Sequence, residues 1–121
     1  MVKQLHKGDE THRRWKIIDA SRTLDVTLLP QLLARLESNE SCENKRHIVR
    51  ALGKIGGAKV ETKLLDLLGS ERGLILGDVA HALGQVGAHL AIPTLMTMRD
   101  HESEWVRQNV IFALRKLKEE T

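Results

Sequence analysis

The chain has 121 residues, enough for one domain with its own core, and 41% of them are hydrophobic although only 2% are aromatic. A core of Leu, Ile, Val and Ala with so few aromatic residues favours packed helices over a β-sandwich or a barrel. The formal charge of +3 comes from 19 basic and 16 acidic residues, so the surface is mixed in sign and attracts polyanions only weakly.

An internal repeat organises the chain. The segment Ala51–Gly56, which reads Ala-Leu-Gly-Lys-Ile-Gly, returns 31 residues later as Ala82–Gly87, and the same frame continues at Ala113 and, weakly, at Ala20. Within each copy the apolar residues fall at i, i+3, i+4 and i+7, the spacing of one buried helical face. We therefore expect seven helices, at 9–24, 27–38, 42–55, 58–69, 72–86, 89–99 and 102–119.

The glycines of the repeat predict how its helices end and pack. Gly56 and Gly87 stand where a helix should end in the left-handed conformation that glycine adopts at little cost. Gly53 and Gly84, one turn earlier, should let a neighbouring helix approach closely. A phosphate-binding loop is a poor interpretation of these glycines, because such a loop follows a strand and the preceding segment here is helical.

Other residues predict where helices begin. Pro30 and Pro93 should occupy opening turns, where the missing N–H does no harm. Ser41, Ser70 and Asp100 precede helices and are expected to act as N-caps.

A pair of short helices cannot bury its apolar face alone, whereas stacked pairs can. The sequence therefore predicts an all-α fold, an α-solenoid (α–α superhelix) of about three helical-hairpin repeats plus a C-terminal helix. We expect one domain over 1–121, with repeats at about 9–38, 42–69 and 72–99 and the C-terminal helix at about 102–119.

These motifs resemble a known family. The Ala-Leu-Gly-x-hydrophobic-Gly helix end, together with Trp105, Val106 and Arg107 at the opening of the next unit, is similar to the HEAT-like repeats of phycobilin lyases and related proteins. The resemblance covers nearly the whole chain and implies a helical solenoid. It implies no single activity, because such repeats serve scaffolds, adaptors, chaperone-like subunits and a few enzymes.

No motif predicts catalysis, a metal or a cofactor. The six histidines include no pair at i and i+4 on one helix, and Cys42 is the only cysteine, which excludes an intrachain disulfide and suits a reducing compartment. One enzyme with this kind of repeat is deoxyhypusine hydroxylase, and a resemblance to it would imply a di-iron site made of His-Glu pairs in successive helices. The corresponding positions here read Arg46-His47, Gly77-Asp78 and Gln108-Asn109, so these ligand pairs are absent. No apolar run reaches the length of a membrane span, so we expect a soluble, cytoplasmic protein that is not an enzyme and has no membrane partner.

Nucleic acid is an alternative partner. Arg46, Arg50 and Lys54 follow each other at i, i+4 and i+8 and should share one helical face. The equivalent positions in the other copies are not basic stripes, so we favour a solvated face and regard nucleic acid as the weaker hypothesis.

The second helix of each pair is expected to form the concave side of the stack, where a protein partner would dock. The residues left there after the apolar face is assigned are polar or small, and the candidates are Gln31, Ala34, Arg35, Thr62, Lys63, Asp66, Thr94, Thr97 and Met98.

The C-terminal helix is a second candidate surface. Ile111 and Phe112 lie in an unbroken apolar run, and no further helix follows to cover it. We expect this helix to dock on a second copy of the chain, forming a homodimer, or on a larger protein.

The sequence thus favours a non-catalytic scaffold or adaptor for another protein of unknown identity. Two alternatives stay open. One is an accessory subunit or chaperone of an enzyme such as a bilin lyase, and the other is nucleic-acid binding through the basic helix face.

Overall fold

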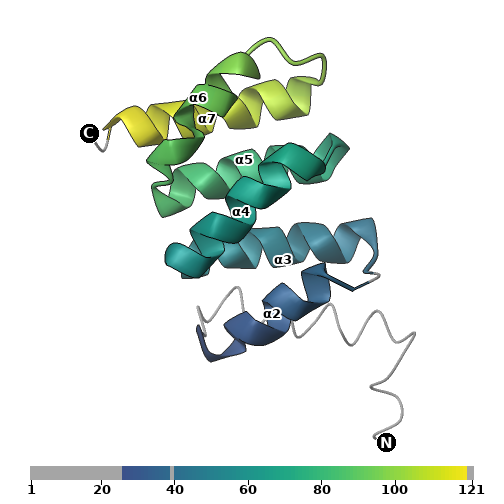
Figure 1. The fold of residues 1–121 in the computed structure, drawn as a ribbon. Helices are drawn as coiled ribbons and strands as arrows, with labels where there is room; N and C mark the ends of the chain where they lie inside the picture. The colour runs from purple at the N-terminus through teal and green to yellow at the C-terminus, as the bar shows by residue number, and fades with distance from the viewer. Residues whose placement is uncertain (1–25, 39, 120–121) are drawn as a thin grey trace, which may run out of the picture.

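The computed structural model describes residues 26–38 and 40–119, and within these ranges all regular structure is helical (Figure 1). The predicted helix at 9–24 lies outside the described residues. The elements in chain order are η2 (Val26–Leu28), α2 (Leu29–Leu36), α3 (Cys42–Ile55), α4 (Ala58–Ser70), α5 (Gly73–Val86), η3 (His89–Ala91), α6 (Ile92–Thr97) and α7 (Glu104–Glu119).

The helices form two layers. The first-helix layer consists of α3, α5 and α7, which lie side by side with α5 in the middle (Figure 1). The second-helix layer consists of α2, α4 and α6, which pack on α3, α5 and α7 respectively. This arrangement is the α-solenoid that the repeat predicts.

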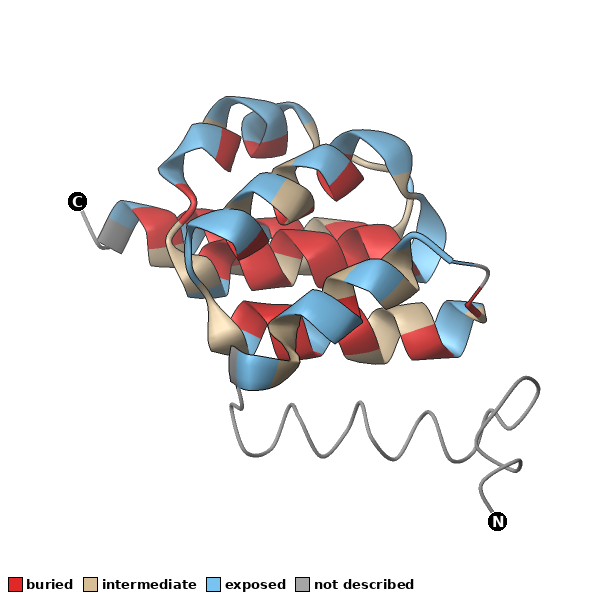
Figure 2. Ribbon diagram, turned by 60° about the horizontal axis from the view of Figure 1, so that its bottom comes forward, coloured by how far each residue is buried: buried red, intermediate tan, exposed pale blue. Residues whose placement is uncertain are grey.

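The core lies where the two layers face each other (Figure 2). Ile48, Val79 and Val110, which occupy the same position in three copies of the repeat, are all fully buried. Burying each such aliphatic side chain contributes roughly 1.5–3 kcal/mol to folding. The predicted apolar face of the first helices is therefore confirmed in every described copy.

Gly53 and Gly84 allow the close approach of neighbouring helices that the repeat predicts. A Cβ on Gly53 would lie 2.9 Å from the Cβ of Ala82, and a Cβ on Gly84 would lie 2.7 Å from the Cα of Ala113. Real side chains do not approach so closely, so these two glycines set the short separation of α3 from α5 and of α5 from α7. The second helices make no comparable contact with one another among the described residues.

Gly56 and Gly87 both end a first helix at positive φ, with φ of 73° and 76°. Gly87 has the predicted left-handed helical conformation, with ψ of 34°, whereas Gly56 has ψ of −168° and does not, so the prediction is correct for Gly87 only. Pro30 and Pro93 stand in opening turns, as predicted. Because proline has no N–H, neither can bond to the carbonyl four residues earlier, and η2 and η3 remain short 3₁₀ turns ahead of α2 and α6. As a result, α2 and α6 begin later than the predicted 27 and 89; they also end earlier than predicted, at Leu36 and Thr97 instead of 38 and 99.

The N-cap prediction is correct for one of three residues. The N–H of Asn44 donates to Oγ of Ser41 at 3.1 Å, which caps α3. Ser70 is the last residue of α4, and α5 begins after Arg72 without a side-chain cap. Asp100 lies too early, because α7 starts at Glu104 and the N–H of Val106 donates to Oγ of Ser103 at 3.3 Å.

Candidate functional site

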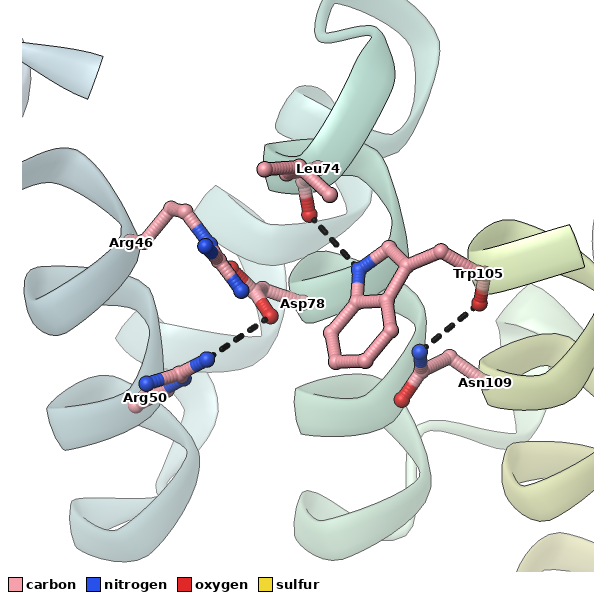
Figure 3. Close-up of polar contacts among 6 residues, drawn as sticks. All are labelled: Arg46, Arg50, Leu74, Asp78, Trp105 and Asn109. Atoms are coloured by element: carbon pink, nitrogen blue, oxygen red, sulfur yellow. Dashed lines mark hydrogen bonds and ion pairs between the residues drawn. The ribbon is translucent and has the colours of Figure 1, made fainter. Parts of the chain in front are cut away.

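A buried carboxylate links the first helices. Asp78, on α5, is only 4% exposed, and Nε of Arg46 on α3 donates to its Oδ2 at 2.6 Å (Figure 3). Nη2 of Arg50 lies 3.7 Å from the other carboxylate oxygen. The hydrogen bond to Asp78 raises the pKa of the Arg46 guanidinium above its usual value. Two cations thus satisfy one buried anion, which would be costly to bury alone.

Trp105 covers the same region from α7. The guanidinium carbon of Arg46 lies 5.6 Å from the centroid of the Trp105 ring, within cation–π range. The indole N–H donates to the carbonyl of Leu74 at 3.1 Å, and Nδ2 of Asn109 donates to the carbonyl of Trp105 at 2.8 Å (Figure 3). A Cβ on Gly77 would overlap the indole, so this glycine makes room for the ring.

One turn further along, His81 on α5 stacks on Phe112 of α7, with ring centroids 4.2 Å apart and planes 8° from parallel. Burial lowers the pKa of His81 below its usual value, against smaller opposing effects of Asp78 and Gln85. Phe112 was predicted to contact a partner, but its ring packs against His81 of the same chain.

Arg46 and Arg50 share one face of α3, as their spacing predicts, but this part of the face is not simply solvated, because both residues contact Asp78. Of the three residues in the predicted basic stripe, only Lys54 has no ion pair with a described carboxylate. A phosphate backbone would have to compete with a carboxylate that already holds two of the three cations.

The second-helix layer is the more open of the two and contains a groove between α2 and α4. The groove has a volume of about 680 Å³, is largely open to solvent, and its walls are mainly apolar. Four of the predicted contact residues line it, Ala34 on α2 and Thr62, Lys63 and Asp66 on α4. We call it the α2–α4 groove, and its other lining residues are Leu33, Glu37, Ala58 and Lys59.

Lys63 ties the two walls of the α2–α4 groove together. Its Nζ donates a hydrogen bond to the carboxylate of Glu37, the residue that follows α2, and it lies 3.9 Å from Oδ2 of Asp66 on its own helix. The hydrogen bond and the charge of Lys63 lower the pKa of Glu37. The ion pair is accessible to solvent at the Glu37 end, so it forms a polar rim.

The remaining predicted residues of the second helices do not join this groove. Gln31 is exposed and Arg35 half-buried on α2, and neither is among the groove's lining residues. Thr94 and Thr97 are exposed on α6, where the hydroxyl of Thr97 donates to the carbonyl of Thr94 at 2.6 Å. Met98 ends α6 and packs against the core. The predicted surface is thus divided between α2–α4 and α6.

A second hollow, of about 450 Å³, is lined by residues of α7 and by residues at and just after the end of α6. Ile111, a predicted partner residue, is 43% exposed there, and Met96 is 39% exposed beside it. We call this region the end surface, and its residues are Met96, Arg99, Asp100, Ile111, Leu114, Arg115 and Lys118.

The described residues contain no group of three or more His, Cys, Asp or Glu side chains placed to hold a metal ion. Their buried side-chain nitrogen and oxygen atoms all have hydrogen-bond partners, including Asn44, whose Nδ2 donates to Glu40 at 3.1 Å. None of the helices described is both long and apolar enough to cross a membrane.

A comparison with protein families matches residues 29–120 to the model described as HEAT repeats. The chain belongs to the HEAT repeat family. The match identifies the repeat and does not distinguish the phycobilin lyase type. No curated protein and no solved structure matched the chain.

HEAT repeats commonly serve as protein-interaction scaffolds. Within this HEAT stack the sequence did not predict Asp78 or the groove residues Leu33, Glu37, Ala58 and Lys59. A signal for Asp78 exists: it is the one carboxylate in α5, a helix otherwise rich in buried apolar residues, and the arginine stripe precedes it by one repeat. No comparable signal marks the groove, because its walls depend on the spacing of two helices.

Proposed function

We propose that this HEAT chain is a non-catalytic scaffold whose α2–α4 groove binds a helix or an extended segment of another protein. The observation that carries the proposal is the open second-helix layer, which leaves an apolar hollow of about 680 Å³ between α2 and α4. An enclosed pocket would suit a small molecule, whereas a shallow hollow that is largely open to solvent suits a polypeptide.

The chemistry of the groove supports a protein partner. Ala34, Ala58 and Thr62 present small side chains, so a partner backbone can come close to both helices. The ion pair of Lys63 with Glu37 supplies charge at the edge. Protein interfaces commonly combine an apolar centre with a polar rim, and we expect a partner segment with apolar side chains in the middle and polar groups at its edges.

Affinity purification from the native cell tests this proposal with two matched variants. Thr62→Arg places a long cation in the groove, and Thr94→Arg makes the same change on the exposed face of α6, outside it. We expect a protein that is retained by the wild type and by Thr94→Arg to be lost from Thr62→Arg. Equal retention by both variants would exclude the groove. Loss from Thr94→Arg alone would assign binding to α6.

The same experiment separates two versions of the scaffold. An adaptor would retain a non-enzymatic protein through the groove, whereas an accessory subunit, as the resemblance to bilin lyases implies, would retain an enzyme. Nucleic-acid binding has less support, because Asp78 already engages Arg46 and Arg50. A DNA-binding titration against salt checks that alternative, since phosphate contacts weaken steeply as salt rises.

A further inference from the structure

The end surface is separate from the α2–α4 groove. Its central residue, Ile111, is exposed, whereas the residues at the same repeat position in the other described copies are buried. Ile111 occupies the repeat position of Val49 and Ala80, both of which are fully buried. Each of those two residues lies one turn before the glycine that meets the next first helix, so the next helix covers it. The same face of α7 leaves Ile111 43% exposed, beside Met96.

One residue shows that a further repeat of the same kind is a poor occupant. Arg115 stands in the position of Gly53 and Gly84, the two glycines that let one first helix approach the next. A helix that approached α7 as closely as α7 approaches α5 would meet the Arg115 side chain. An occupant of the end surface must therefore lie further out, over Ile111 and Met96, and accommodate a guanidinium that stays charged.

The charges around the apolar centre indicate the chemistry of that occupant. Arg99, Arg115 and Lys118 line the end surface together with a single carboxylate, Asp100. Among the described residues neither Arg99 nor Arg115 takes part in an ion pair. A two-fold contact between copies centred here would place this net positive surface against itself, which complementarity of charge disfavours.

We propose that the end surface binds an acidic amphipathic helix of another protein. Its apolar side chains would cover Ile111 and Met96, and its carboxylates would face Arg99 and Arg115. This contact would give the scaffold a second binding surface at the far end of the helical stack from the α2–α4 groove.

A pair of synthetic peptides tests the proposal with the full chain. Both peptides are amphipathic helices with the same leucine stripe, flanked by Glu in one and by Lys in the other, and binding is followed by fluorescence anisotropy. We expect the Glu peptide to bind the wild-type chain at least about tenfold more tightly than the Lys peptide, and the preference to shrink between about 0.1 M and about 1 M salt.

Two variants with the same change in net charge locate the contact. Arg115→Glu reverses a charge on the end surface, and Arg72→Glu reverses one on the exposed turn before α5. The Glu peptide should bind Arg72→Glu as it binds the wild type and lose at least about tenfold on Arg115→Glu, while the Lys peptide should gain on Arg115→Glu. Equal loss on both variants, or no preference between the peptides on the wild type, overturns the proposal.

Sedimentation equilibrium tests the competing occupant, a second copy of the chain. A monomer over the working concentration range agrees with the proposal. A dimer that Ile111→Asp dissociates and that the Glu peptide does not displace would assign the end surface to self-association and overturn the proposal. Neither result bears on the α2–α4 groove, which Thr62→Arg tests separately.

Discussion

Arg46 and Asp78 join two neighbouring first helices through a hydrogen bond of 2.6 Å between the guanidinium Nε and the carboxylate Oδ2. The two residues are 32 positions apart, so the contact runs from one repeat to the next. The glycine contacts set the distance between α3 and α5, and this pair adds a polar link across the same junction.

Asp78→Asn should destabilise the fold by about 2 kcal/mol, because it removes the charge that two arginines share while keeping the size of the side chain. Asp66→Asn is the matched control: Asp66 is 73% exposed and lies 3.9 Å from Lys63, so its loss should cost less than about 0.5 kcal/mol. Urea unfolding of both variants measures the difference. Equal destabilisation would mean that the buried pair contributes no more than a surface pair.

Gly84→Ala and Gly69→Ala should change stability in opposite directions. The first adds a Cβ that would lie 2.7 Å from the backbone of Ala113, so α5 and α7 must separate, at a cost of about 1–3 kcal/mol. The second adds a methyl group to a helical glycine with nothing within 4 Å, which should stabilise α4 by about 0.5–1 kcal/mol. Thermal unfolding of the two variants measures the signs, and a stabilised Gly84→Ala would show that close approach is not required.

Ser41→Ala should cost about 1 kcal/mol, since it removes the side-chain oxygen that accepts from the N–H of Asn44 at the start of α3. Ser70→Ala should change stability by less than about 0.5 kcal/mol, because Ser70 is exposed at the end of α4 and caps no helix. The two chains can be compared by denaturant midpoint. A similar loss in both would argue against the cap at Ser41.

These residues show what the sequence could predict. Repetition fixes the spacing of the buried positions, so Ile48, Val79 and Val110 could be placed in the core, and α3 could be given its observed limits, Cys42–Ile55. A glycine has few structural reasons to recur, so close packing at Gly53 and Gly84 was also predictable.

Other features depend on where the helices lie relative to one another. The link between Arg46 and Asp78 requires a particular rotation of α3 against α5, which a periodic pattern does not specify. An N-cap depends on the residue at which a helix begins, which a periodic pattern locates only to within a few positions, so the pattern predicts Ser70 as a cap although it is the last residue of α4. The α2–α4 groove requires an angle between two second helices, and of the nine residues predicted on the second helices only Ala34, Thr62, Lys63 and Asp66 lie in it.

His81 should make the free energy of unfolding depend on pH, and the direction of its pKa shift decides whether stability rises or falls with pH. Burial lowers its pKa below the ordinary 6.5, and Arg50 acts in the same direction, while Asp78 and a hydrogen bond with Gln85 oppose them. A base with a lower pKa in the folded state binds protons more tightly when unfolded. Its contribution to stability is therefore fully present above pH 6.5 and is lost as the pH falls below that value towards the folded pKa.

Two substitutions isolate this effect from other titrating groups. His81→Gln keeps a polar side chain beside Asp78, and His81→Phe keeps a ring to stack on Phe112. Between about pH 8 and about pH 5 the wild type should lose more free energy of unfolding than either variant, because neither replacement takes up a proton. Urea unfolding at a series of pH values gives the three curves. Parallel curves would show that His81 binds its proton equally well in the folded and unfolded chains. That result would contradict the claim that burial between α5 and α7 lowers the pKa of His81.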